Sequence, residues 1–137
     1  MKDISNPLIK AYYDALTPLG YPVYEGEEPD DELAKMYIVI SDVSSTDASA
    51  KSNNAHNANI QVTINSWEVK YNNSKSLNTV AGLVLTAIKP GPVSTLTATG
   101  IGIVTTTLQN DNTTAYGKLS GRVYISRNLI FSHLISY

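Results

Sequence analysis

Residues 73–89 read NSKSLNTVAGLVLTAIK, and the rest of the chain is organised around this stretch. Its apolar residues recur with the three-four spacing that lays one apolar stripe along an α-helix. They are Leu77, Val80, Ala81, Val84, Leu85 and Ile88. A side-chain oxygen of Asn73 or Ser74 is expected to cap the first N–H groups, and Pro90 ends the helix. The stripe needs a cover, so a sheet from the flanking strands is expected.

A second helix is predicted over residues 6–19, with Asn6 as its cap and Pro7 at its first position. Pro18 and Gly20 end it. Its apolar face consists of Leu8, Ala11, Tyr12, Ala15, Leu16 and Leu19. This spacing predicts that the helix also lies on the sheet.

The strand signals are distributed over both halves of the chain. Residues 20–26 predict a short edge strand, because Pro22 cannot donate to a ladder, and residues 36–41 predict a strand buried on both faces. Alternating residues predict a strand over 60–71 with a bulge near Ser66. Residues 93–108 predict a long strand bent at its glycines, followed by a turn at 110–112. Residues 118–125 and 129–137 are predicted to return, with a break at 127–128.

Together these elements predict an α+β fold with a mixed, mostly antiparallel sheet of about five strands and two helices packed on it. The 137 residues suit one domain, spanning 1–137. Residues 43–59 are rich in Ser, Asn, Ala and Asp without an apolar period, and they are predicted to form a polar loop or arm.

No catalytic, cofactor-binding or metal-binding residue is predicted. The chain has no cysteine, and no ligand spacing links His56 to His133. The acidic residues within 27–32 lack the order of a calcium loop, and Gly100 and Gly102 lack the third glycine of a dinucleotide loop. A solvated loop and a bent strand are the simpler interpretations. The chain is therefore expected not to be an enzyme and to need no cofactor.

The charge pattern gives little support to nucleic-acid or membrane binding. The net charge is -2, and only 16% of the residues are charged. Lys118, Arg122 and Arg127 are close in the sequence, and salt bridges within or between subunits are favoured over phosphate contacts. No apolar run approaches the ~20 residues of a membrane span. Two alternatives stay open, a small nucleic-acid-binding module and an enzyme with an unrecognised site.

The order of these segments resembles the tail terminator, or tail-completion, proteins of bacteriophages. The resemblance extends over nearly the whole chain and depends on order and composition instead of a catalytic motif. It is carried by NPLI at 6–9, GYPVY at 20–24, YIVIS at 37–41, the strand at 60–64, the helix from Ser74 and LIFSH at 129–133.

The resemblance implies a structural virion protein that forms a ring, commonly a hexamer, at the head–tail neck or the top of the tail tube. Such a ring joins tail to portal or neck and leaves a channel through which genomic DNA passes without sequence recognition. Its partners would be copies of itself, neck or portal-adaptor proteins and tail-tube proteins. It would be found in the virion, and in the host cytoplasm during assembly. A short-tailed phage could use the same subunit in its neck.

Contacts between subunits are then expected along 93–108, 129–137, the polar stretch 44–59 and the tip at 110–114. The candidate contact residues are Lys51, His56, Asp111, Arg122, Arg127, Phe131, His133 and Tyr137. Deleting residues 45–57 is expected to prevent ring assembly while leaving the chain folded.

Overall fold

The structure is a computed structural model that describes residues 4–26, 36–47, 54–68, 73–119 and 122–137. In chain order the elements are α1 (Ser5–Leu16), the 3-10 helix η1 (Thr17–Leu19), β1 (Val23–Glu25), β2 (Met36–Asp47), β3 (Ala55–Glu68), α2 (Asn73–Ile88), β4 (Gly102–Leu119) and β5 (Arg122–Ser136). The strands form one five-stranded sheet in the order β1-β2-β3-β5-β4. Only β1 and β2 are parallel, so the predicted α+β fold is confirmed.

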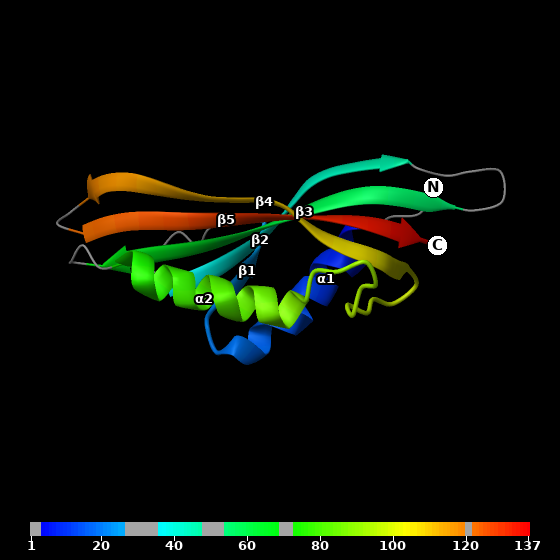
Figure 1. Ribbon diagram of the computed structural model, residues 1–137, viewed down its shortest axis with the longest axis horizontal. Coiled ribbons are helices and arrows are strands. Elements are labelled where there is room, and N and C mark those ends of the chain that lie inside the picture. Colours follow the sequence, from blue (N-terminus) through cyan, green and yellow to red (C-terminus); the bar gives the residue numbers. More distant parts are fainter. Residues whose placement is uncertain (1–3, 27–35, 48–53, 69–72, 120–121) are drawn as a thin grey trace.

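Both helices cover the same face of the sheet, and among the described residues the opposite face carries no helix (Figure 1). The strands twist strongly, so they diverge from one another toward both ends of the sheet. α2 packs on β3 and β5, and α1 packs on β2 and on α2. The predicted stripe of α2 is confirmed, because Leu77, Val80, Ala81, Val84 and Ile88 are all buried.

The start of α1 differs from the prediction. Ile4, not Asn6, is the N-cap residue, and no side chain caps the helix. Ile4 is buried in the core and its carbonyl accepts the N–H of Leu8, so apolar packing fixes the start two residues earlier than the predicted polar cap. The end agrees with the prediction, since Gly20 takes a left-handed conformation at φ 89° after η1.

α2 ends at Lys89, a non-glycine residue with a positive φ of 52°. Its N–H donates to the carbonyl of Leu85 at 2.9 Å, and Pro90 follows. The predicted caps, Asn73 and Ser74, have side chains outside the described part of the structure. The same holds for the acidic stretch at 27–32 and for Lys51.

The polar loop or arm predicted at 43–59 is corrected where the structure describes it, because residues 43–47 and 55–59 belong to two long strands. β2 runs on to Asp47 and β3 begins at Ala55, with Ser44 opposite Asn59 and Asp47 opposite His56. β5 continues on the other side of β3, so the backbone ladder supports this stretch although its side chains lack an apolar period. The residues that the structure describes here therefore form an extended β-hairpin, and not a loop.

The bulge predicted near Ser66 is also wrong. β3 pairs with β5 without a register shift, and Ile64, Asn65 and Ser66 are all buried. Both faces are covered here, so side-chain polarity no longer alternates with the pleat. The bulge in β2 lies instead between Asp42 and Ser44.

The carboxy-terminal half has two long strands where shorter pieces were predicted. β4 starts at Gly102 and passes straight through the predicted turn at Asn110–Asn112 to include Lys118. β5 passes through Arg127 and Asn128 without a break. Bulges at three places in β4 absorb its irregular pattern. One prediction is confirmed: Leu129, Phe131, His133 and Ile135 share the buried face of β5.

Candidate functional site

A buried polar network joins α1 to the centre of the sheet. The hydroxyl of Tyr12 on α1 hydrogen bonds to Nε2 of His133 on β5, and the two rings meet edge to face at 5.3 Å. Nδ1 of His133 lies 3.0 Å from the carbonyl oxygen of Ala58 on β3. A carbonyl only accepts, so Nδ1 carries the proton and Nε2 accepts from the Tyr12 O–H. Burial lowers the pKa of His133 and raises that of Tyr12.

His56 and Tyr137 form a second contact, at the carboxy-terminal end of the sheet. Their rings lie 5.2 Å apart, and His56 is buried. The backbone N–H of Tyr137 donates to the carbonyl of Asn54 at 3.2 Å, which closes β5 against the start of β3. Both residues therefore stabilise the end of the β2–β3 hairpin at which β2 finishes and β3 begins.

A charged cluster joins β4, β5 and α2 on the helix-covered side. The guanidinium of Arg127 donates to both carboxylate oxygens of Asp111, at 2.8 and 2.6 Å, and also to Oδ1 of Asn78 at 2.9 Å. The hydrogen bond from Arg127 lowers the pKa of Asp111. The fork geometry suits a guanidinium and a carboxylate. The cluster is only partly exposed, so it ties α2 to the edge of the sheet.

Two stretches of strand edge have no strand beside them in the described part of the chain. On one side of the sheet, β1 covers β2 only at Ile38–Ile40, which leaves Asp42 to Thr46 uncovered. On the other side, Gly91 and Ser94 bond to Thr106 and Val104 and so cover only the start of β4. From Thr107 onward, β4 is an uncovered edge. Such edges present backbone donors and acceptors that can pair with another chain.

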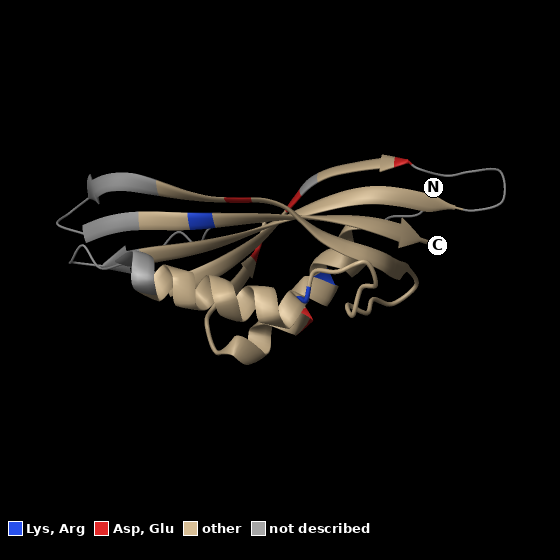
Figure 2. Ribbon diagram, viewed as in Figure 1, with Lys and Arg blue, Asp and Glu red and all other residues tan. Residues whose placement is uncertain are grey.

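Figure 2 shows few charged residues along the strands, and by register none of those with described side chains lies on the helix-free face of the sheet. The register puts amides and hydroxyls side by side there, mainly Asn57, Asn59, Gln61, Thr63, Asn110, Asn112, Asn128 and Ser132. Gln61 and Thr63 both bond to Oδ1 of Asn128, and Nδ2 of Asn128 donates to Asn112. This amide network crosses β3, β5 and β4. The charged residues Asp42, Asp111 and Arg127 lie on the other face by register.

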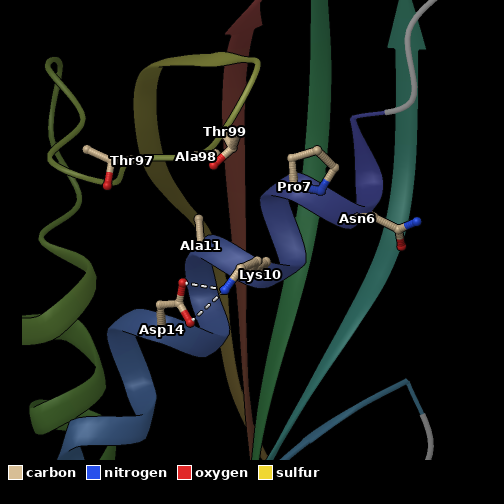
Figure 3. A pocket seen from close by; sticks show the side chains of 8 residues that line it. All are labelled: Asn6, Pro7, Lys10, Ala11, Asp14, Thr97, Ala98 and Thr99. Carbon is tan, nitrogen blue, oxygen red and sulfur yellow. Dashed lines mark hydrogen bonds and ion pairs between the residues drawn. The ribbon is translucent and has the colours of Figure 1, made fainter.

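Two of the clefts lined by described residues can be compared, and neither gathers catalytic groups. The larger one, about 480 Å³, lies between the outer side of α1 and residues 97–99 (Figure 3). Its charged residues, Lys10 and Asp14, pair with each other at 3.0 Å and are well exposed. The smaller one, about 400 Å³, lies beside Val104, Leu134 and Tyr137 at the carboxy-terminal end of β5.

The predicted contact residues divide into three groups. Phe131, His133 and His56 are buried within a single chain, so they support the surface and are not part of it. Asp111 and Arg127 are brought together as an ion pair, and Tyr137 is half-buried at the end of the sheet. Lys51 and the side chain of Arg122 lie outside the described structure. The expected effect of deleting 45–57 is corrected too, because the deletion removes the buried His56.

Sequence reasoning missed the residues that complete these contacts. Tyr12 was read as one member of an apolar face, and its hydroxyl was given no partner. Asn78 and Asn128 carry no local pattern, since their partners lie 49 and 65 positions away in the sequence. A polar atom on an otherwise apolar stripe is the one signal that could have identified Tyr12.

Within the described ranges, no group of three His, Asp or Glu residues is arranged to hold a metal ion. Over the same ranges, no helix has both the length and the apolarity that crossing a bilayer requires.

Comparison with known proteins finds a likeness in fold alone. No family model and no curated protein sequence matches this chain. A chain of a solved structure described as the virion of a native gene transfer agent particle has the same fold, with a TM-score of 0.77. The two chains are 17% identical, and the match covers 100% of each. The whole architecture, from α1 to β5, is thus shared with a protein of that particle.

Proposed function

We propose that this chain is a structural subunit of a phage-like virion and makes or breaks no bond. The observation that carries the proposal is the full-length fold match to a chain of the gene transfer agent virion. The match covers 100% of both chains, so the likeness is not confined to one shared motif. Fold alone does not fix function, so the surfaces supply the second argument.

The surfaces suit a protein that acts through contacts with copies of itself. β4 presents a long uncovered edge from Thr107, and β2 presents a shorter one on the opposite side of the sheet. Edges on opposite sides support head-to-tail association, which closes into a ring when the rotation between neighbours allows it. The low charge of the sheet weakens repulsion between copies.

We infer further that the assembly is a ring, with six copies as the expected number, at the head–tail neck or the top of the tail tube. Its neighbours there would be a neck or portal-adaptor protein and the tail-tube protein. Genomic DNA would pass through the central channel without sequence recognition. The uncharged sheet face and the small net charge support passage without tight binding.

Electron microscopy of the purified chain, combined with mass measurement in solution, tests this proposal. Rings with a central hole and a mass that is a fixed multiple of 14.8 kDa are expected. A monomer at every concentration, or turnover of a small molecule by that monomer, would refute it. Salt-sensitive binding to an oligonucleotide would favour the nucleic-acid-binding alternative instead.

A further inference from the structure

We infer that each copy inserts the uncovered end of β2, residues 42–46, beside the uncovered part of β4 in the next copy. The two sheets would then continue as one. This inference deepens the ring proposal by naming the strands and their relative position. It starts from the strand directions, which alternate: β2 is antiparallel to β3, β3 to β5 and β5 to β4. A second copy placed beside β4 in the same orientation therefore offers its β2 antiparallel to β4.

Steric blocks at both ends require a shift between neighbouring copies. The register places Ile40, Val62, Leu129 and Asp111 on one line across the sheet. In an unshifted neighbour, β1 would occupy the edge of β2 beside Asp111. Gly91 and Ser94 block β4 at Thr106 and Val104. The open stretches meet fully only if the neighbour slides along the strand direction.

The pleat determines which shifts are allowed. Ser44 and Thr46 lie on the helix-free face, opposite Asn59 and Asn57, and Asn110, Asn112 and Thr114 lie on the same face of β4. A continued sheet keeps its faces, so Thr46 must meet one of these three residues. Across the sheet of one copy, the register aligns Thr46 with Leu134 of β5 through Asn57. It aligns Asn110 with Ile130, which lies four residues away along β5. The permitted shifts are therefore four, six or eight residues, about 14 to 27 Å at ~3.4 Å per residue, and only the largest, Thr46 opposite Thr114, also moves the neighbour's β1 past the end of β4 at Leu119.

Charge favours this pairing over the pairing of two like edges. The uncovered part of β2 carries one carboxylate, Asp42, and no cation. Pairing β2 with β2 would bring the Asp42 carboxylates of two copies near each other. On β4, Asp111 is already neutralised by Arg127. By strand alternation the backbone N–H of Asp111 points away from β5, where it donates to Oδ1 of Asn110 at 2.9 Å, so the Asn110 side chain must turn aside before a neighbouring strand pairs there.

Introduced cysteines test the pairing directly, because the chain has none of its own. A chain that carries Thr46→Cys together with Asn110→Cys, Asn112→Cys or Thr114→Cys would be oxidised and run on a non-reducing gel. At least one pair is expected to give a ladder of covalent multimers. Thr46 and Asn110 lie on opposite edges with β3 and β5 between them, so no bond forms within one chain.

The matched control combines Thr46→Cys with Thr113→Cys, which lies on the other face, and no ladder is expected from it. Efficient dimers from Asn110→Cys alone would show β4 pairing with β4 and would overturn the inference. Rings visible by microscopy without a ladder from any of the three pairs would also overturn it, while the ring proposal stands. A chain that stays monomeric without cross-links would refute the ring proposal itself.

A backbone variant gives a second readout. Strand alternation makes the N–H of Thr113, like that of Asp111, point away from β5. Thr113→Pro removes this donor and leaves the β4–β5 ladder intact, so a folded chain with at least tenfold weaker assembly is expected. Asn112→Pro is the control, since it removes a bond to β5 and should lower the melting temperature of the monomer. Unchanged assembly of a folded Thr113→Pro chain would contradict the inference.

Discussion

The hydroxyl of Tyr12 is hydrogen bonded to Nε2 of His133, although the two residues lie 121 positions apart in the sequence. The bond joins the first helix to the last strand, and the imidazole passes the connection on to Ala58 of β3. Every polar side-chain atom in this buried series of hydrogen bonds has a partner. The backbone ladder joins β3 to β5 but does not include α1, so the side-chain bonds hold all three elements in one arrangement.

Tyr12→Phe should lower the free energy of unfolding by about 1–3 kcal/mol, because it leaves the buried Nε2 of His133 without a donor. Urea unfolding of the two proteins at pH 7.5 measures the change. Tyr13→Phe is the matched control, since Tyr13 is the adjacent residue and its side chain is 37% exposed. A change within about 0.5 kcal/mol is expected for it. Equal effects of the two substitutions would contradict the network.

Stability should fall on acidification because of His133. Its pKa in the folded protein lies below the usual 6.5, so the unfolded chain binds more protons between the two values. The stabilisation is full above about pH 6.5 and is lost as the pH falls toward the folded pKa, by up to ~1.4 kcal/mol per pH unit. Urea unfolding between pH 8 and pH 5 measures it. His133→Gln, which does not titrate, should show a shallower loss, and a parallel loss would rule this group out.

At alkaline pH, the same network should make the stability of the folded protein fall as the pH rises. The pKa of Tyr12 is raised well above 10.0 by burial, so the folded state keeps a proton that the unfolded chain releases. Stability is therefore expected to fall as the pH rises above about 10. Ultraviolet titration should show Tyr12 among the tyrosines that ionise only on unfolding. The Tyr12→Phe variant should lack that late step.

Asp111→Ala should cost about 1 kcal/mol, more than Asp14→Ala. Asp111 accepts two hydrogen bonds from a half-buried Arg127, whereas Asp14 pairs with Lys10 in an exposed contact between residues four apart on α1. Exposed pairs of that kind contribute about 0.3–0.5 kcal/mol. Thermal unfolding of both variants in low and high salt compares them. The stability change should depend less on salt for Asp111→Ala than for Asp14→Ala. The opposite order would show that the pair of Asp111 and Arg127 is fully solvated.

Lys89→Gly should raise the stability by about 0.5–1 kcal/mol. Lys89 ends α2 with a φ of 52°, where a side chain is strained and glycine is not. Lys89→Ala is the control that removes the same charge but keeps the strain, so it should give no such gain. Melting temperatures of the three proteins decide the question, and an equal gain from alanine would attribute the effect to the charge.

The sequence identified the elements whose periodicity is set by one buried face. The stripe of α2, the apolar run of β2 and the buried face of β5 are all as predicted, because each packs against the same core. Residues 42–47 and 55–59 were predicted as a loop, since strands of Ser, Asn and Thr have no apolar alternation. Their structure comes from backbone pairing with distant neighbours, which local composition does not report.

The contacts at the candidate surface were predictable only in part. Arg127 and Asp111 were both selected as contact residues, but their pairing depends on the β4–β5 register. That register could not be derived from the sequence, because Asn and Asp favour turns in isolation and a turn was predicted at 110–112. The uncovered edges became visible only with the strand order, since an edge is a property of the whole sheet.

The short segment from Gly91 to Ser94 has a further consequence for the free subunit. A strand as long as β4, uncovered along its whole length, would be a template for fibre growth in which identical copies stack level with one another. By occupying the first part of that strand, the segment withdraws its first residues from such stacking, so that only the stretch from Thr107 stays open. In the pairing proposed above, the same backbone contacts would also prevent two copies from meeting without an offset.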